Sequence, residues 1–309
     1  MCGIARRFSW VSAVVILLSA AFLPASCQPE QKMEGKLTVV ATIFPAYDMA
    51  RAVGGDNAVY EILVSPGTEA HSFEPTPIDM KKLHEADIFI MSGAGIEPWA
   101  KDILSGVDNP NLLVVDASSG ITLLKAAGGN EEGAYDPHYW LDFDNAKKEI
   151  DNITAAFVTK DGAHASEYEA RAAAYKKKFD ELGVLYRDGL KDCQGREIIS
   201  SGHFSFAYLA HRYGLTLVSV FGISPDAEPT PERVRSVISL IKQKDARYIY
   251  AEEMVEPRVA ETIQEETGVQ ILFLNPGHEL PKEKFDGGIT LADIMRDNLQ
   301  QLKRGLQCQ

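Results

Sequence analysis

The sequence predicts an α/β protein made of two parallel-sheet halves that are joined by one long helix. Short apolar segments with strand character alternate with helical segments in both halves of the 309-residue chain. That alternation is typical of parallel βαβ units. Between the halves, residues 145–191 contain no proline and are rich in Ala, Glu and Lys, which favours helix.

The first half is expected to contribute four strands and three helices. LTVVAT has the pattern of a buried strand, and the Pro66-Gly67 pair breaks the chain after the second strand. Pro77 stands near the start of the second helix, where proline is tolerated. The predicted strands are residues 37–42, 58–63, 88–92 and 112–116, and the predicted helices are 45–53, 76–86 and 99–105.

Residues 145–191 are predicted to form the linking helix. Apolar side chains recur there every three or four residues, as on the buried face of a helix. The stretch is far longer than an average globular helix, and Gly162 indicates a local break or kink. A coiled-coil dimer is the alternative, but the sequence does not sustain an a/d heptad with flanking e/g charges.

The second half repeats the alternation of the first. Its predicted strands are residues 197–200, 215–220, 248–251 and 269–274, and its predicted helices are 204–213, 231–244, 255–267 and 291–306. Two similar halves with a stiff connector leave a cleft between them, and clefts of this kind are common ligand sites.

The first 27 residues have the pattern of an export signal. Arg6 and Arg7 precede a short apolar run at 11–23, and small residues then lead to Cys27. The run is too short for a comfortable membrane span. Because small residues before a cysteine are typical of a bacterial lipoprotein signal, we expect Cys27 to be lipidated and residues 28–36 to form a tether. An ordinary cleaved signal and an uncleaved anchor are the alternatives.

The remaining cysteines predict one disulfide. Cys2 would leave with the signal and Cys27 would carry the lipid, so Cys193 and Cys308 are the two other thiols. Exported proteins meet an oxidising compartment, where such a pair tends to be bridged. Two free thiols are the alternative.

Composition excludes one class of partner. The formal net charge is −13, whereas proteins that bind nucleic acid usually carry a basic patch. We therefore expect no nucleic-acid partner, and we expect the chain to be a monomer.

Three histidines stand out by their surroundings. His71 lies in GTEAHSFEPTP, His138 in DPHYWLD and His203 in SGHFSFAYLAHRYGL. Each is at a strand-to-helix or loop-to-helix junction, where a parallel sheet presents its ligand-binding edge. Because they come from both halves, the predicted site is a cage around an ion, unlike the compact zinc finger or HExxH motif.

With GISPDAEPTPERV and AEEMVEPRVAETIQEETG, these segments resemble the zinc/manganese-type solute-binding lipoproteins of metal ABC importers, the high-affinity zinc uptake binding protein family. The resemblance covers residues 37–306 in one consistent order. It implies two Rossmann-like lobes, at 37–144 and 192–309, with a rigid backbone helix joining them and the metal between them. It also implies a cognate permease and ATPase, and a membrane-anchored location in the periplasm or on the cell surface.

The same resemblance assigns His71 and His138 as metal ligands of the N-terminal lobe and His203 as the third ligand. Imidazole suits Zn2+ better than Mn2+, which prefers carboxylate oxygen. We therefore expect Zn2+, with Mn2+ as the alternative. The His-rich loop of many zinc-type members is replaced here by the short acidic stretch KAAGGNEEGAYDPH, which weakens the preference for zinc.

The fourth ligand departs from the family pattern. The family supplies an Asp in a motif like LDPLG, whereas FLNPGHEL places Asn275 at that position. We expect Asn275, or a water that it orients, to complete the site. Replacement by His278 or Glu279 and a site left open to solvent are the alternatives. Glu252 is expected to hydrogen-bond to an imidazole and fix its tautomer, with a solvated carboxylate as the alternative.

These expectations describe capture and delivery of an ion without enzymatic chemistry. A zinc hydrolase is the first alternative, because three histidines with an open fourth position are how catalytic zinc is held. What the sequence lacks for that role is a general base next to a ligand. A surface adhesin or interaction protein is the second alternative, and surface display is compatible with it.

Overall fold

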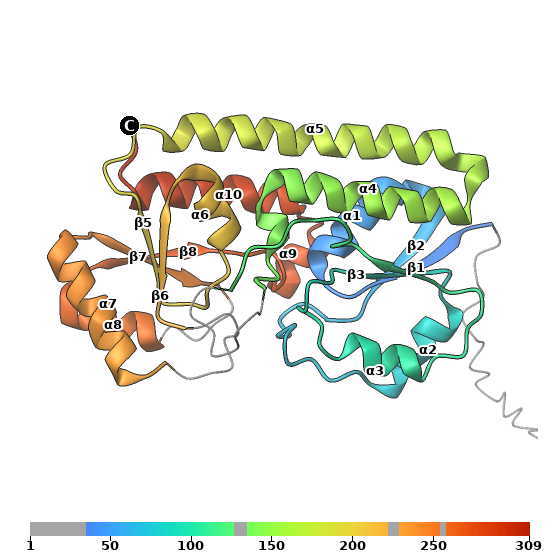
Figure 1. Cartoon of the computed structure of the whole chain (residues 1–309), viewed down its shortest axis with the longest axis horizontal. Coiled ribbons are helices and arrows are strands. Elements are labelled where there is room, and N and C mark those ends of the chain that lie inside the picture. Colours follow the sequence, from blue (N-terminus) through green and yellow to red (C-terminus); the bar gives the residue numbers. More distant parts are fainter. Residues whose placement is uncertain (1–34, 127–134, 222–228, 254–257) are drawn as a thin grey trace, which may run out of the picture. The chain divides into compact units, whose positions relative to one another are not determined.

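The computed structural model describes residues 35–126, 135–221, 229–253 and 258–309, which belong to one compact unit, Glu34–Gln309 (Figure 1). The predicted signal, Cys27 and most of the tether lie outside the described residues. Within the described part of the chain, none of the helices combines the length and apolarity needed to cross a membrane.

The N-terminal lobe contains a four-stranded parallel sheet in the order β2-β1-β3-β4. Its elements are β1 (Leu37–Ala41), α1 (Phe44–Gly54), β2 (Ala58–Ile62), α2 (Pro77–Glu85), β3 (Ile88–Met91), α3 (Ala100–Ser105) and β4 (Leu113–Asp116). Pro77 lies at the start of α2, as the sequence indicated. Thr76 and Asp79 form a capping box at the same end.

The C-terminal lobe repeats this topology with the order β6-β5-β7-β8, again all parallel. Its elements are β5 (Glu197–Ser200), α6 (Ala207–Tyr213), β6 (Thr216–Ser219), α7 (Pro231–Lys244), β7 (Tyr248–Glu252), α8 (Arg258–Thr267), β8 (Gln270–Leu274), α9 (Lys282–Asp286) and α10 (Leu291–Gly305). All eight predicted strands are confirmed to within one residue at each end. The short helix α9 was not predicted, and α6 begins three residues later than expected.

The linking region differs from the prediction of a single helix over 145–191. Two helices occupy it, α4 (Phe143–Lys160) and α5 (Ala165–Leu190), and a short turn at 161–164 separates them. Asp161 fixes this turn, because its carboxylate accepts hydrogen bonds from the Tyr168 hydroxyl at 2.6 Å and from the His164 ring at 2.7 Å. The break expected at Gly162 is therefore a complete reversal.

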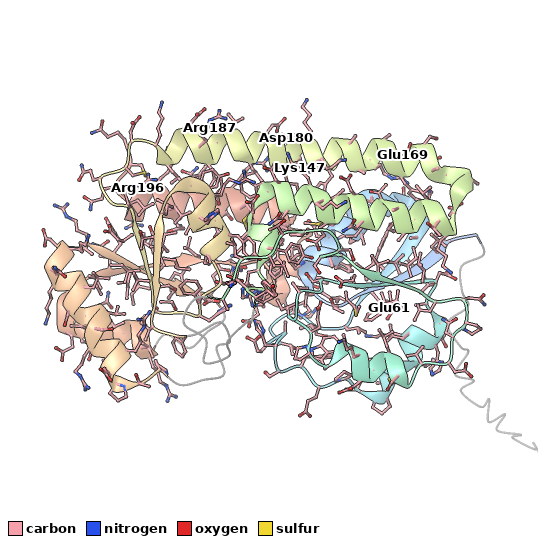
Figure 2. All side chains as sticks on the ribbon, in the orientation of Figure 1. Glu61, Lys147, Glu169, Asp180, Arg187 and Arg196 are labelled. Atoms are coloured by element: carbon pink, nitrogen blue, oxygen red, sulfur yellow. A yellow bond between two sulfur atoms is a disulfide. The ribbon has the colours of Figure 1, made fainter. Side chains whose placement is uncertain are left out.

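The two helices consequently lie side by side, and the 26-residue α5 also packs on α1 and α10 (Figure 1). Lys147 of α4 donates to Asp180 of α5 at 2.5 Å. Both residues are labelled in Figure 2. The Tyr186 hydroxyl of α5 donates to the carbonyl of Met295 in α10 at 2.6 Å. The long helix is thus braced against both lobes.

One buried apolar cluster runs from the N-terminal sheet through α4, α5 and α10 to β8, and includes Ile90, Phe157, Phe179, Leu299 and Leu272. A second, smaller cluster fills the space beneath α7 and α8. Because the larger core is continuous across both lobes, it holds the strand ends that face the cleft at fixed positions.

The structure contains the disulfide that was expected between Cys193 and Cys308, which are 115 positions apart in sequence. The bridge ties the segment after α5 to the segment after α10. Export into an oxidising compartment, inferred from the first 27 residues, was sufficient to predict it.

Candidate metal centre

Four histidines meet where the two lobes face each other. His71 follows β2, His203 follows β5 and His278 follows β8, while His138 lies in the connection between β4 and α4. The carboxyl ends of parallel strands present loops at the same edge of a sheet. Each lobe therefore contributes two imidazoles to the same place.

The imidazoles are close enough to share one ion. One nitrogen from each of the four rings lies within 4.8 Å of the corresponding nitrogen of the other three. The ring centroids of His138 and His203 are 5.0 Å apart, and the His71 and His203 centroids are 6.1 Å apart. The three sequence-predicted ligands are brought together, and His278 joins them.

Two buried carboxylates orient two of the rings. His138 Nδ1 lies 2.8 Å from Asp136 Oδ1, and His203 Nδ1 lies 2.8 Å from Glu252 Oε1. Each carboxylate oxygen also accepts the backbone N–H of the same histidine. A proton on each Nδ1 leaves Nε2 as the lone-pair donor that a metal needs. Glu252 thus lies where the sequence placed it, as the hydrogen-bond partner of an imidazole.

The sequence analysis missed Asp136. The carboxylate stands two positions before His138 in DPH, and its short side chain turns back to the backbone and ring of that histidine. Asx side chains commonly make this local bond. The position of an Asp two residues before His138 was the sequence feature from which this contact could have been predicted.

His278 is held in place by the turn before it. Gly277 has φ +93°, and a side chain there would meet Leu291 at 2.7 Å, so only glycine fits this conformation without strain. Trp140 Nε1 donates to the carbonyl of Pro276 at 2.8 Å. Trp140 follows His138 by two residues, so one hydrogen bond fixes the loops of two histidines from different lobes.

The ring of His278 is buried, and neither of its nitrogens makes a hydrogen bond to the described residues. Its Nε2 lies 4.0 Å from Glu279 Oε1, beyond hydrogen-bond distance. Buried polar atoms are almost always satisfied, and leaving one unmade costs about 1–3 kcal/mol. A bound cation would satisfy one of the two nitrogens of this ring.

Asn275 is engaged elsewhere. Its Oδ1 accepts from the N–H of Gly277 at 2.7 Å, and its Nδ2 donates to Glu253 at 3.2 Å. Its backbone is paired with the side chain of Asn298. These contacts engage both polar atoms of the Asn275 side chain and shape the turn that leads to His278, whereas the sequence analysis expected Asn275, or a water that it orients, to complete the metal site.

Acidic side chains border the histidines. Glu69, His278 and Glu279 form a second group with ligand atoms within 4.8 Å of one another. The Oε1 of Glu69 also accepts from the backbone N–H of His71 at 2.8 Å. Carboxylates at this distance attract a divalent cation toward the imidazoles.

Electrostatics keep most of the cage neutral. Burial, with repulsion from the neighbouring rings, lowers the pKa of His138 and of His278 well below the ordinary value. Burial also disfavours charge on His203, but the Glu252 carboxylate outweighs it and raises the pKa of that ring. Burial raises the pKa of Asp136 to about 7. Neutral imidazoles are the form that binds metal.

The chain was compared with known protein families and structures. The family described as "Zinc-uptake complex component A periplasmic" matches residues 39–305. The chain belongs to this family. The match spans both lobes and all four histidines, and the family is a transport component, which sets aside the hydrolase alternative.

Relatives in this zinc-uptake family include the "High-affinity zinc uptake system protein ZnuA" of Bacillus subtilis, 33% identical over 96% of each chain. The "Zinc-binding lipoprotein AdcA" of Streptococcus pneumoniae is 32% identical over 95% of this chain. The present chain spans 60% of the length of that AdcA protein.

Solved structures confirm the fold. The Zn(II)-bound ZnuA-like domain of S. pneumoniae AdcA is 32% identical, with a TM-score of 0.77 over 88% of this chain and 99% of that domain. The laminin-binding protein Lmb of Streptococcus agalactiae is 31% identical, with a TM-score of 0.80 over 88% of this chain and 99% of the other. Lmb is described as bifunctional, with adhesin and metal-transporting activity. Both comparisons bear out the predicted architecture of two α/β lobes joined by a long helix.

Proposed function

We propose that this chain is the extracytoplasmic solute-binding component of an ABC importer, which captures Zn2+ between its lobes and delivers it to a membrane permease. The observation that carries the proposal is the convergence of four imidazoles, two from each lobe, with ligand atoms within 4.8 Å of one another. Membership of the zinc-uptake family and the zinc-bound AdcA domain support the choice of ion.

In this proposal the ligands are His71, His138, His203 and His278. Four nitrogen donors at the corners of a small cage match the tetrahedral coordination that Zn2+ adopts. Mn2+ prefers oxygen ligands and a larger coordination number, so a set of four imidazoles selects against it. His278 takes the place that the sequence analysis gave to Asn275, because the turn at Gly277 brings its ring to the cage.

The positive charge of the bound ion would be balanced in part by carboxylates that contact the opposite side of the imidazole rings. Four neutral imidazoles leave the +2 charge of zinc intact, and Asp136 and Glu252 lie one ring away from it. Each carboxylate makes its imidazole a stronger donor as well as fixing its orientation. The carboxylates Glu69 and Glu279 add negative charge beside His278.

Release requires a modest shift of the lobes that loosens the cage, because each lobe supplies two ligands while a continuous core joins the lobes. Several contacts join the lobes near the cage. They include the hydrogen bond from Trp140 to Pro276, the hydrogen bond from the Tyr208 hydroxyl to the Asp136 carbonyl at 2.8 Å, and the ion pair of Arg212 in α6 with Asp142 at the start of α4, at 2.6 Å and 2.9 Å. Docking on the permease would act by weakening such contacts.

We further propose that the chain acts as a monomer and is anchored by a lipid on Cys27. Family membership supports export, and several relatives are named as lipoproteins. Mass spectrometry of the protein purified from membranes would detect the lipid, and an unmodified cysteine at that position would contradict the anchor.

The central experiment is elemental analysis of the purified protein followed by competitive titration of Zn2+ and Mn2+ against a chromophoric chelator. We expect one zinc per chain and a preference for zinc of at least about a hundredfold. A protein without tightly bound metal would favour the adhesin alternative. Cells that depend on this chain for zinc uptake should also fail to grow under zinc limitation when His138 is replaced by Ala.

A further inference from the structure

A cavity lies away from the metal centre and has no role in the proposed capture of zinc. It has a volume of about 620 Å3 and lies between the end of α1, the start of β2, the middle of α5 and the segment that precedes α10. None of the four clustered histidines lines it.

The lining of this cavity is rich in positive charge. Four cationic side chains line it, against two acidic ones. The cations are Lys36, Arg51, Arg171 and Lys178. The whole chain carries a net charge of −13. The excess of cations in the cavity is therefore opposite in sign to the net charge of the protein.

Three of the cations are positioned by defined contacts. Arg171 donates through Nε to the Val53 carbonyl at 2.7 Å and through Nη2 to the Gly54 carbonyl at 3.0 Å. Its Nη1 pairs with Glu167 at 3.2 Å, so part of its charge is balanced at the surface of α5. The Arg51 guanidinium lies 5.5 Å from the centre of the Tyr47 ring. The Lys178 ammonium lies 5.3 Å from the centre of the Tyr175 ring. Interactions with carbonyls and aromatic faces orient a cation without neutralising it.

The acidic residues of the lining are placed differently. Asp48 is buried, and it accepts hydrogen bonds from the Tyr175 hydroxyl and, at 2.9 Å, from the N–H of Leu291. The Oδ2 atom of Asp48 therefore serves the packing of α1 against α5 and α10. Asp56 is exposed at the turn after α1. Among the residues that the structure describes, neither acid forms an ion pair with the four cations. Burial raises the pKa of Asp48, and the charges of Arg51 and Lys178 act on it in the opposite direction.

We propose that this cavity binds a phosphate-bearing anion. Two guanidinium and two ammonium groups line one space, and both kinds of cation bind phosphate oxygens in proteins. The volume exceeds that of inorganic phosphate alone, and the small side chains of Ala52 and Ala58 leave room for an attached alcohol group. A free phosphate compound and a phospholipid headgroup share this chemistry.

The position of Lys36 brings the lipid source within reach. Lys36 lies nine residues after Cys27, and nine residues span at most roughly 30 Å. If Cys27 is lipidated as proposed above, the mouth of the cavity lies within a short tether of the membrane surface. A tether of this length lets the cavity come within about 10 Å of the surface, the range in which basic side chains are attracted to anionic headgroups.

The test uses the full chain in micelles of a neutral detergent, with binding measured by titration calorimetry. One arm adds inorganic phosphate, a second adds micelles doped with phosphatidylglycerol, and a third adds micelles doped with phosphatidylcholine. The variant R51Q/K178Q removes two cations from the cavity. The matched control R187Q/K191Q removes two cations from the far end of α5 (Figure 2, where Arg187 is labelled).

We expect binding in the phosphate arm, the phosphatidylglycerol arm or both, and at least a tenfold weakening in R51Q/K178Q with little change in R187Q/K191Q. Binding to phosphatidylglycerol alone identifies a headgroup site, and binding to phosphate identifies a free ligand. No binding in either arm overturns the proposal, as does an equal loss in both variants. Zinc affinity should stay unchanged in both variants, and their melting temperatures check folding, so failure here and failure of the zinc proposal are separate results.

Discussion

The Nε2 atoms of His138 and His203 face each other across the two lobes at 3.2 Å. Because the Nδ1 atom of each ring is directed at a carboxylate, both Nε2 atoms present lone pairs to the same point. Two lone pairs at this distance repel unless a proton or a metal ion lies between them. Zinc–nitrogen bonds of about 2.0–2.1 Å in a tetrahedron place neighbouring nitrogens roughly 3.3 Å apart, so this spacing suits a shared zinc ion.

Replacing His278 with Ala should weaken zinc binding by more than the roughly 10- to 100-fold that is typical when a residue behind a metal ligand is lost. The ring is buried, and its nitrogens have no hydrogen bonds to the described residues, so the proposed coordination is its contribution to the site. Competition with a chromophoric chelator gives the affinity.

The matching test of Asn275 is Asn275→Asp. If residue 275 were the fourth ligand, a carboxylate there would strengthen zinc binding. We expect no gain and some loss of stability, because Asp cannot donate to Glu253 as the Asn275 amide does. If zinc affinity were unchanged in His278→Ala, or clearly higher in Asn275→Asp, residue 275 would be the fourth ligand.

Glu252→Gln should lower zinc affinity by about tenfold while leaving the fold intact. Glutamine retains an oxygen that can accept from His203 Nδ1, but it removes the negative charge that strengthens this imidazole as a donor. Glu197→Gln is the control, since that side chain pairs with Lys244 at 2.6 Å at the start of β5, away from the strand end that leads to His203. An equal effect of the two substitutions on affinity would mean that Glu252 contributes only to the overall charge of the protein.

The sequence was sufficient to predict both sheets and three of the four clustered histidines. Short apolar runs indicate the parallel strands, and His71, His138 and His203 lie within recognisable motifs. His278 could be named only as an alternative, because its position depends on a turn. That turn rests on the positive φ of Gly277 and on a hydrogen bond between Gly277 and Asn275, which pattern and spacing do not reveal.

The helical region shows a second limit of sequence reasoning. Both α4 and α5 bury one face, so the apolar periodicity continues across the turn between them. Asp161 ends α4 through contacts of its side chain with His164 and Tyr168. A carboxylate and a glycine inside a long periodic segment indicate a break, but they do not distinguish a kink from a reversal.

Unfolding measured without metal should depend on pH through Glu149. This carboxyl is fully buried in α4, and burial, with repulsion from Glu97, raises its pKa to about 8. Because the pKa is raised in the folded state, the unfolded chain ionises first as the pH rises. The free energy of unfolding should therefore fall between about pH 4.5 and pH 8, by at most roughly 5 kcal/mol from this group.

Glu149→Gln should flatten that dependence and make the protein relatively more stable at pH 8. Urea unfolding at pH 5 and pH 8 in the presence of a chelator measures both effects. Glu181→Gln, at an exposed position on α5, should leave the slope of the free energy of unfolding against pH unchanged. A slope that survives Glu149→Gln would assign the pH dependence to other groups, of which Glu97 is the first to examine, because burial raises its pKa to about 7.

Removing the disulfide should destabilise the protein without altering zinc affinity. The bridge joins Cys193 and Cys308 across 115 positions, and closing a loop of this size in the unfolded chain typically contributes about 2–5 kcal/mol. The double variant Cys193→Ala/Cys308→Ala should therefore unfold at lower urea concentration. Treating the unaltered protein with a reductant should produce the same shift, and the reductant should have no effect on the double variant.

Zinc affinity should be the same in the double variant and the unaltered protein, because the ligands are held by strand ends and by the continuous core. A loss of zinc affinity on reduction would show that the disulfide after α5 also sets the relative position of the lobes.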